Sequence, residues 1–219
     1  GGFSQWDVFN HAKALSLFSK NLPSLKDISE SHCFCLPDMK PFAAAAESSF
    51  QFLKSITPGK LSWPMILDLL ANALRRAELE MKYEDATART YAAIEKIAKL
   101  QLESAYGINN AKCAPEQLPE KLREDFTRKY SGGDGTLKFG ALASYEVLLH
   151  LGDTYGRRFA QLPKVNAHMT ERNHSILGHG FQSMDKPKFD ALFDDALKIL
   201  SVETTSLPSF PKMAGDDRL

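Results

Sequence analysis

Arg172 and His179 are the two side chains in this 219-residue chain whose types and spacing best suit chemistry on a phosphate. They stand seven positions apart, close to two helical turns, so in a helix both would project from one face about 10 Å apart along the axis. Arginine supplies a permanent cation that fits phosphate oxygens, and histidine can accept or release a proton near neutral pH. Together these two groups suit the cleavage of a phosphodiester bond.

The segment around this pair is locally basic, although the chain as a whole carries 27 lysines and arginines against 27 aspartates and glutamates. A neutral chain is not expected to bind nucleic acid over a broad surface, but a locally basic segment fits a small phosphate site. The alternative is a solvated helix end, where the helix dipole favours cations. The cations between residues 157 and 188 are Arg157, Arg158, Lys164, Arg172, Lys186 and Lys188, and the anions there are Glu171 and Asp185.

No metal or cofactor is expected. His168, His174 and His179 are separated by six and five residues, which does not place them on one helical face. The three cysteines give no disulfide framework, which favours a reducing compartment. A glycine-rich phosphate loop and a nucleophile elbow are both missing from the sequence, which excludes a Rossmann nucleotide site and the usual serine hydrolase. No stretch approaches the roughly 20 apolar residues that cross a bilayer.

The elements that must position this chemistry are all predicted to be helices, so the fold class is all-α. Pro23 should end the first helix, and Gly107 fits a helix stop. Three parts are expected: an N-terminal helical extension over 1–60, a helical core over 61–203, and a mobile tail over 204–219. The main helices are predicted at about 6–22, 42–56, 63–80, 83–106, 119–130, 142–151, 165–179 and 188–200.

The string Arg172-Asn173-x5-His179, which continues as Gly180-Phe181, resembles the R-x(4–6)-H signature of HEPN domains. The upstream stretches over 72–77 and 83–95 resemble the preceding helical pair in CRISPR-associated CARF–HEPN proteins of type III systems. Trp6-Asp7-x-Phe9-x-His11 resembles the entry to their helical part. The resemblance covers most of residues 3–200.

This resemblance implies a HEPN-type helical bundle with additional N-terminal helices. It further implies a metal-independent endoribonuclease that cleaves single-stranded RNA as a homodimer, in the cytoplasm of a prokaryote with antiviral CRISPR immunity. Fuller members carry an N-terminal CARF domain that binds a cyclic oligoadenylate. This chain shows no such Rossmann-like unit, so either that sensing domain precedes it in the natural protein or the protein departs from the family plan.

The resemblance and the chemistry of the side chains together suggest roles for six residues. His179 would deprotonate the ribose 2′-hydroxyl or protonate the leaving 5′-oxygen. Arg172 would stabilise the charge of the transition state, and Asn173 would orient the phosphate or its neighbours. Ser175 could bind the phosphate or a backbone carbonyl. His174 lies about 200° around the helix from Arg172, which favours a structural contact over catalysis. RNA binding is assigned to Ser175, His174 and Lys186.

Two rival functions use the same sequence features. One is a non-catalytic HEPN module for dimerisation or binding, and the intact arginine and histidine weigh against it. The other is the toxin of a toxin–antitoxin pair. Arg76, Arg89 and Glu95 are further charged candidates in the upstream helical pair, and for Arg76 a solvated ion-pair face is favoured.

Overall fold

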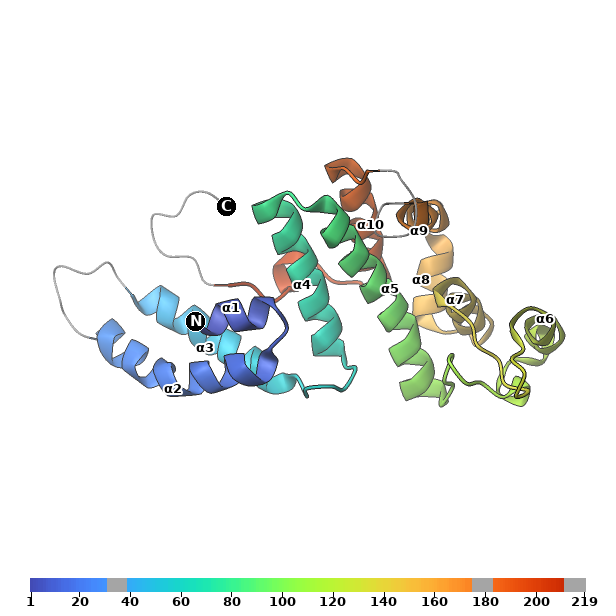
Figure 1. Cartoon of the computed structure of the whole chain (residues 1–219), viewed down its shortest axis with the longest axis horizontal. Coiled ribbons are helices and arrows are strands. Elements are labelled where there is room, and N and C mark those ends of the chain that lie inside the picture. The colour runs from blue at the N-terminus through green and yellow to red at the C-terminus, as the bar shows by residue number, and fades with distance from the viewer. Residues whose placement is uncertain (31–38, 175–182, 211–219) are drawn as a thin grey trace. The chain divides into compact units, whose positions relative to one another are not determined.

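The computed structural model of the chain describes residues 1–30, 39–174 and 183–210, and the side chains of all of these except residues 170–174 (Figure 1). Within these ranges the chain is built from helices and short turns, with two isolated bridges at Leu137 and no strand, which confirms the all-α prediction. The helices are α1 (Gly2–Asp7), α2 (His11–Glu30), α3 (Lys40–Ser55), α4 (Trp63–Glu80), α5 (Tyr83–Tyr106), α6 (Glu120–Tyr130), α7 (Ala141–His150), α8 (Thr154–Gln161), α9 (Val165–His174) and α10 (Lys186–Leu200), with 3₁₀ turns at Pro115–Gln117 and Thr204–Ser206.

The N-terminal unit comprises residues 1–72 together with the chain from residue 207. Its core is aromatic: Trp6 is fully buried, stacks on Phe52 at 5.7 Å and contacts Phe210 at 5.1 Å between ring centroids. Burying several large rings is the main source of stability in such a small helical unit. The indole N–H of Trp6 donates to Asp68 of α4 at 2.8 Å, so the buried ring also satisfies its one polar group.

Two predictions for this unit are wrong. The predicted first helix is two helices, because the chain turns after Asp7 and Phe9 adopts a positive φ of 57°. Pro23 does not end α2, which continues to Glu30. Leu22 and Leu25 on either side of the proline both pack on the aromatic core, and this packing outweighs the cost of a proline inside a helix.

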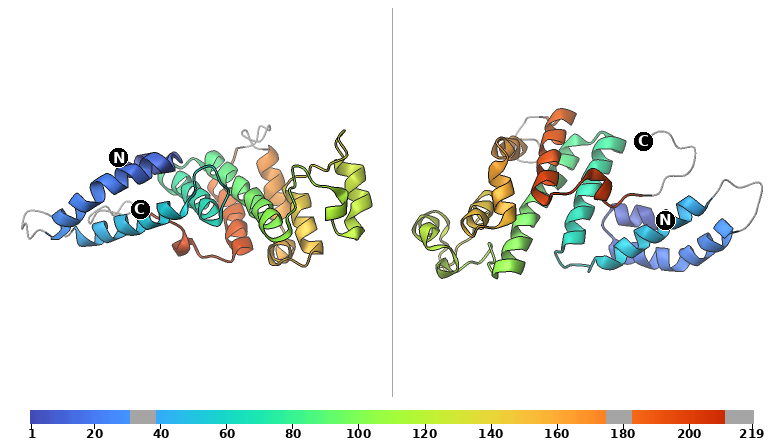
Figure 2. Two further views of the ribbon diagram at one scale, coloured as in Figure 1. Left: turned by 90° about the horizontal axis from the view of Figure 1, so that it is seen from below. Right: turned by 180° about the vertical axis from the view of Figure 1, so that it is seen from behind.

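The C-terminal unit comprises residues 73–206. Its central helix is α5, which contacts α7, α9 and α10 (Figure 2). The buried stripe of α5 includes Ala86, Ala93 and Ile97, at the helical spacing predicted from the sequence. Gly107 ends the helix in the left-handed conformation, with φ 65°, and its N–H returns to the last turn.

α7 and α8 form the tightest pair in the C-terminal unit. Tyr145 and Phe159 stack in parallel with centroids 3.9 Å apart, and Gly156 of α8 lies against the backbone of Leu149. α8 was not predicted from the sequence, because it spans only eight residues and contains a glycine. Asp153 caps its N-terminus, with the side chain accepting a hydrogen bond from the Tyr155 N–H at 2.7 Å.

The sequence predicts a mobile tail from residue 204, and in the structure two apolar side chains of residues 204–210 make packing contacts. Thr204–Ser206 form a 3₁₀ turn, Leu207 is buried, and Phe210 packs on Trp6. Phe210 packs against the aromatic core of the N-terminal unit, whereas residues 204–206 and 209 are exposed. Residues 211–219 lie outside the described part of the chain.

Candidate functional site

The predicted catalytic string begins inside α9 and leaves the described part of the chain. The backbone of Arg172, Asn173 and His174 lies in the last turn of α9 as described. Their side chains, and all of Ser175 and His179, lie outside the description. The predicted gathering of Arg172, Asn173 and His179 at one site therefore stays a prediction. The structure does describe the residues that fix both ends of this segment.

The helix that carries the arginine is anchored on its neighbours. Val165 and Met169 of α9 are buried, with 2% and 1% of their surface exposed. Directly before Met169 in the sequence, His168 contacts Asp195 of α10 with 2.6 Å between Nδ1 and Oδ2. The apolar pair and the polar contact together hold α9 in one place one turn before Arg172.

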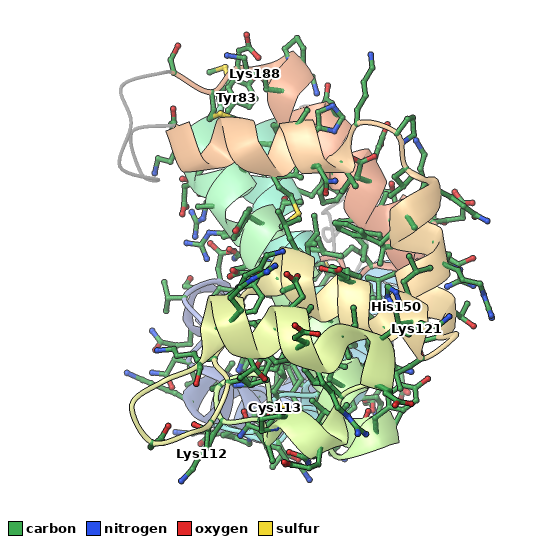
Figure 3. All side chains as sticks on the ribbon, turned by 90° about the vertical axis from the view of Figure 1, so that its right-hand side faces the viewer. Tyr83, Lys112, Cys113, Lys121, His150 and Lys188 are labelled. Carbon is green, nitrogen blue, oxygen red and sulfur yellow. The ribbon has the colours of Figure 1, made fainter. Side chains whose placement is uncertain are left out.

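The chain is held again by contacts at Met184 and Asp185. The backbone N–H of Met184 donates to Glu84 Oε1 of α5 at 2.6 Å. Asp185 then caps α10, with its side chain accepting from the Lys188 N–H. Figure 3 shows Tyr83 of α5 and Lys188 of α10 at the same end of the C-terminal unit, with Cys113 at the other end. Met184 therefore lies at the start of α5.

Only one of the two carboxylate oxygens of Glu84 has a hydrogen-bond partner among the described residues. Its second carboxylate oxygen, Oε2, is buried without a hydrogen-bond partner among the described residues, and so is the hydroxyl of Thr87, one turn further along α5. Buried polar oxygens are costly when they have no donor. The start of α5 therefore contains two buried oxygens without a described partner, and one of them belongs to the carboxylate that binds Met184.

Comparison with known protein families identifies the family of this chain. Residues 58–203 match the family model described as the Csm6 HEPN domain. The chain belongs to the Csm6 HEPN domain family. The match runs from just before α4 to just after α10, and it includes Arg172 and His179. No curated protein and no solved structure matches the chain significantly.

Membership confirms the predicted resemblance to a HEPN domain of a CRISPR-associated protein and suggests a CRISPR-associated HEPN ribonuclease. In the described ranges of this HEPN protein, no cluster of three histidine, cysteine or acidic side chains is placed to hold a metal ion. No described helix is long and apolar enough to cross a membrane.

Lys186 of the HEPN domain is already paired with carboxylates. Its Nζ lies 3.1 Å from Glu78 Oε1 and 3.2 Å from Asp190 Oδ1, and half of the side chain is exposed. Hydrogen bonds to Glu78 and then Asp190 raise the pKa of Lys186. An RNA phosphate would have to compete with both carboxylates for this lysine.

The upstream helical pair of the HEPN domain is joined by ion pairs. Asp85 accepts from Arg89 at 3.1 Å and lies 3.7 Å from Arg76, which also pairs with Glu80. The predicted ion pairing of Arg76 is confirmed. The predicted solvation is wrong, since only 14% of its side chain is exposed. These residues hold α4 against α5.

Sequence reasoning missed the residues that anchor the catalytic segment. Asp195 and Glu84 were not singled out, and His168 was considered only as a metal ligand. Asp195 lies 27 residues from His168, and Glu84 lies 100 residues from Met184. The sequence gives no signal for such distant partners. The one available hint was an acidic residue on the predicted buried side of the helix over 188–200.

Proposed function

We propose that this chain is a metal-independent endoribonuclease that cleaves single-stranded RNA. The observation that carries the proposal is the match of residues 58–203 to the Csm6 HEPN domain with the Arg172-Asn173-x5-His179 string intact. A pure scaffold needs neither the arginine nor the histidine. The catalytic core would span 61–203, with 1–60 as a helical extension.

The reaction would use the ribose 2′-hydroxyl as the nucleophile. The 2′-oxygen attacks phosphorus, the bond to the 5′-oxygen breaks, and the products are a 2′,3′-cyclic phosphate and a 5′-hydroxyl. His179 would transfer one of the two protons involved. Arg172 would bind the charge that grows on the phosphate oxygens, and Asn173 would orient the phosphate.

The site would be completed by a second copy of the chain. One histidine and one arginine per chain are few for a site that must remove one proton and deliver another, and a two-fold axis would double both. Ser175, His174 and Lys186 would contact the RNA. The burial of Met169 in α9 and the hydrogen bond from Met184 to Glu84 hold the described residues that flank the catalytic segment. The setting would be cytoplasmic CRISPR antiviral defence.

The decisive experiment incubates purified protein with a single-stranded RNA oligonucleotide in EDTA. We expect products that end in a 2′,3′-cyclic phosphate, and no cleavage of the matching DNA, which lacks the nucleophile. His179→Ala and Arg172→Ala should each lower the rate by about 100-fold or more. Equal background cleavage by the wild-type protein and both variants would show a non-catalytic module instead.

A further inference from the structure

The HEPN domain contains a cavity that the proposed mechanism does not use. Its volume is about 430 Å³, and it lies between α6, α7, α8 and the first turn of α9, helices that Figure 1 shows next to one another. Sites for small organic groups have volumes of roughly 300–1,000 Å³. The buried rings of Tyr145 and Phe159, stacked at 3.9 Å between centroids, form part of the lining. The cavity therefore has a firm apolar wall.

Two leucines of α7 leave apolar surface exposed at this cavity. Leu142 is 46% exposed and Leu149 is 39% exposed, and both line the cavity. They stand seven positions apart, which is close to two helical turns, so they lie on one face of α7 with Glu146 between them. Apolar surface that a folded chain leaves uncovered in a concave place favours a bound apolar group.

The polar groups of the cavity can orient such a ligand. Glu146 is exposed and lines the cavity, and among the described residues its carboxylate accepts no hydrogen bond. The hydroxyl of Tyr145 is already used, since it donates to the Ile94 carbonyl at 2.9 Å. The partly exposed ring of Tyr130 is held by an edge-to-face contact with Phe126 at 5.0 Å between centroids. A held aromatic ring, apolar walls and an accepting carboxylate therefore meet in one cavity.

A nucleic-acid base has the chemistry that this cavity fits. A base is flat and apolar on both faces, and single-stranded RNA is bound by stacking of these faces on aromatic rings. An ionised carboxylate can only accept hydrogen bonds. Guanine presents two adjacent donors at its Watson–Crick edge, the N1–H and the N2 amino group, so it can use both carboxylate oxygens. Adenine and cytosine present one amino group there, and uracil presents one N–H between two carbonyl oxygens that repel a carboxylate.

We propose that this cavity binds a guanine base of the single-stranded RNA substrate and that Glu146 selects this base. This inference rests on the proposed function, which supplies the RNA. The Glu146 carboxylate accepts from N1–H and from the N2 amino group, while Tyr130, Leu142 and Leu149 contact the base. Lys164 is exposed directly before α9 begins, and it offers a cation for the RNA backbone.

The binding test uses 2′-O-methyl oligonucleotides, which cannot be cleaved because the 2′-oxygen is blocked. A uridine oligonucleotide with one central guanosine should bind about 10-fold more tightly than the all-uridine oligonucleotide. Glu146→Gln should reduce this guanine preference to within about three-fold, because an amide offers both a donor and an acceptor and so pairs with uracil as well. A purely structural role of Glu146 would weaken both oligonucleotides and keep the preference.

Two further variants and a free nucleoside sharpen this test. Glu124→Gln changes an exposed glutamate of α6 that does not line the cavity, so it should keep the wild-type preference. Ala160→Phe fills the cavity from an exposed position, so it should abolish the preference while the melting temperature stays unchanged. Free guanosine should bind more weakly than the oligonucleotide, because it lacks backbone phosphates. Equal affinity for free guanosine would overturn RNA as the ligand.

RNA cleavage in EDTA distinguishes a failed base assignment from a failed proposed function. If the wild-type protein cleaves RNA but binds the guanosine and uridine oligonucleotides within about three-fold of each other, the guanine site is overturned and the proposed function stands. If the protein cleaves nothing but Glu146→Gln abolishes a guanine preference, the ribonuclease falls and the cavity remains a site for guanine in RNA. If the protein cleaves nothing and shows no base preference, both are overturned.

Discussion

Glu84 Oε1 accepts a hydrogen bond from the backbone N–H of Met184 at 2.6 Å, across 100 residues of sequence. This bond joins the first turn of α5 to the first residues described after the catalytic segment. Glu84→Ala should therefore release those residues, leave the Met184 N–H without its partner, and lower the free energy of unfolding by about 1–3 kcal/mol.

Hydrogen exchange at the Met184 amide and urea unfolding would check this prediction. Glu84→Gln keeps an acceptor and should retain most of the protection, while the exposed Glu124→Ala serves as a control. Unchanged exchange at Met184 in Glu84→Ala would show that another group holds this segment.

Asp68 accepts from both Trp6 and His11 in the core of the N-terminal unit. Asp68→Ala would leave both ring nitrogens buried without their acceptor, so we expect a loss of about 3–5 kcal/mol in the free energy of unfolding. Asp68→Asn should cost less, because its amide oxygen can still accept from Trp6. Urea unfolding followed by tryptophan fluorescence measures the loss, with the exposed Asp27→Ala as the reference variant. A change below about 1 kcal/mol in Asp68→Ala would contradict this account.

Gly156 leaves no room for a side chain. A Cβ at this position would lie 2.8 Å from the Leu149 Cα and closer still to the Leu149 nitrogen, both of which belong to the backbone of α7. Gly156→Ala should therefore push α7 and α8 apart and lower stability by about 1–3 kcal/mol or more. Gly133→Ala, where a Cβ meets nothing within 4 Å, should be close to neutral. Thermal unfolding of the two variants makes the comparison, and equal melting temperatures would refute the close packing.

Cys113 is fully buried, and burial raises the pKa of its thiol, with a smaller contribution from Glu116. A raised pKa means less thiolate at a given pH, and thiolate is the form that alkylating agents attack. Iodoacetamide at pH 8 should therefore modify Cys113 much more slowly in the native protein than in urea. Peptide mass spectrometry reports this cysteine by itself. Equal native and unfolded rates would mean that the region around Cys113 opens readily.

The helices of the HEPN core could be predicted because their local signals agree. The spacing of apolar residues and the glycine at 107 place α4 and α5 at the predicted bounds, 63–80 and 83–106. Where a local signal conflicts with packing, the prediction fails. Pro23 is a strong local breaker, yet α2 continues through it because Leu22 is buried and Leu25 packs, partly buried, on the same core.

For the candidate site, the sequence predicts the residues that could carry the chemistry but not the residues that pack against them. Arg172 and His179 stand out by residue type and spacing, and these are properties of a short stretch of sequence. Asp195 is one of three aspartates in the last helix, and its place on the predicted buried side does not tell which residue it contacts. Only the packing of α10 against α9 selects it as the partner of His168.

The Asp68 carboxylate lies inside the matched region 58–203, but the rings that it binds come from residues before that region. A fragment trimmed to the family boundaries would strip two donors from this carboxylate and expose the apolar surface that Trp6 now covers. A stable fragment that contains Asp68 should therefore also contain Trp6 and His11, and so begin upstream of residue 6, outside the matched region.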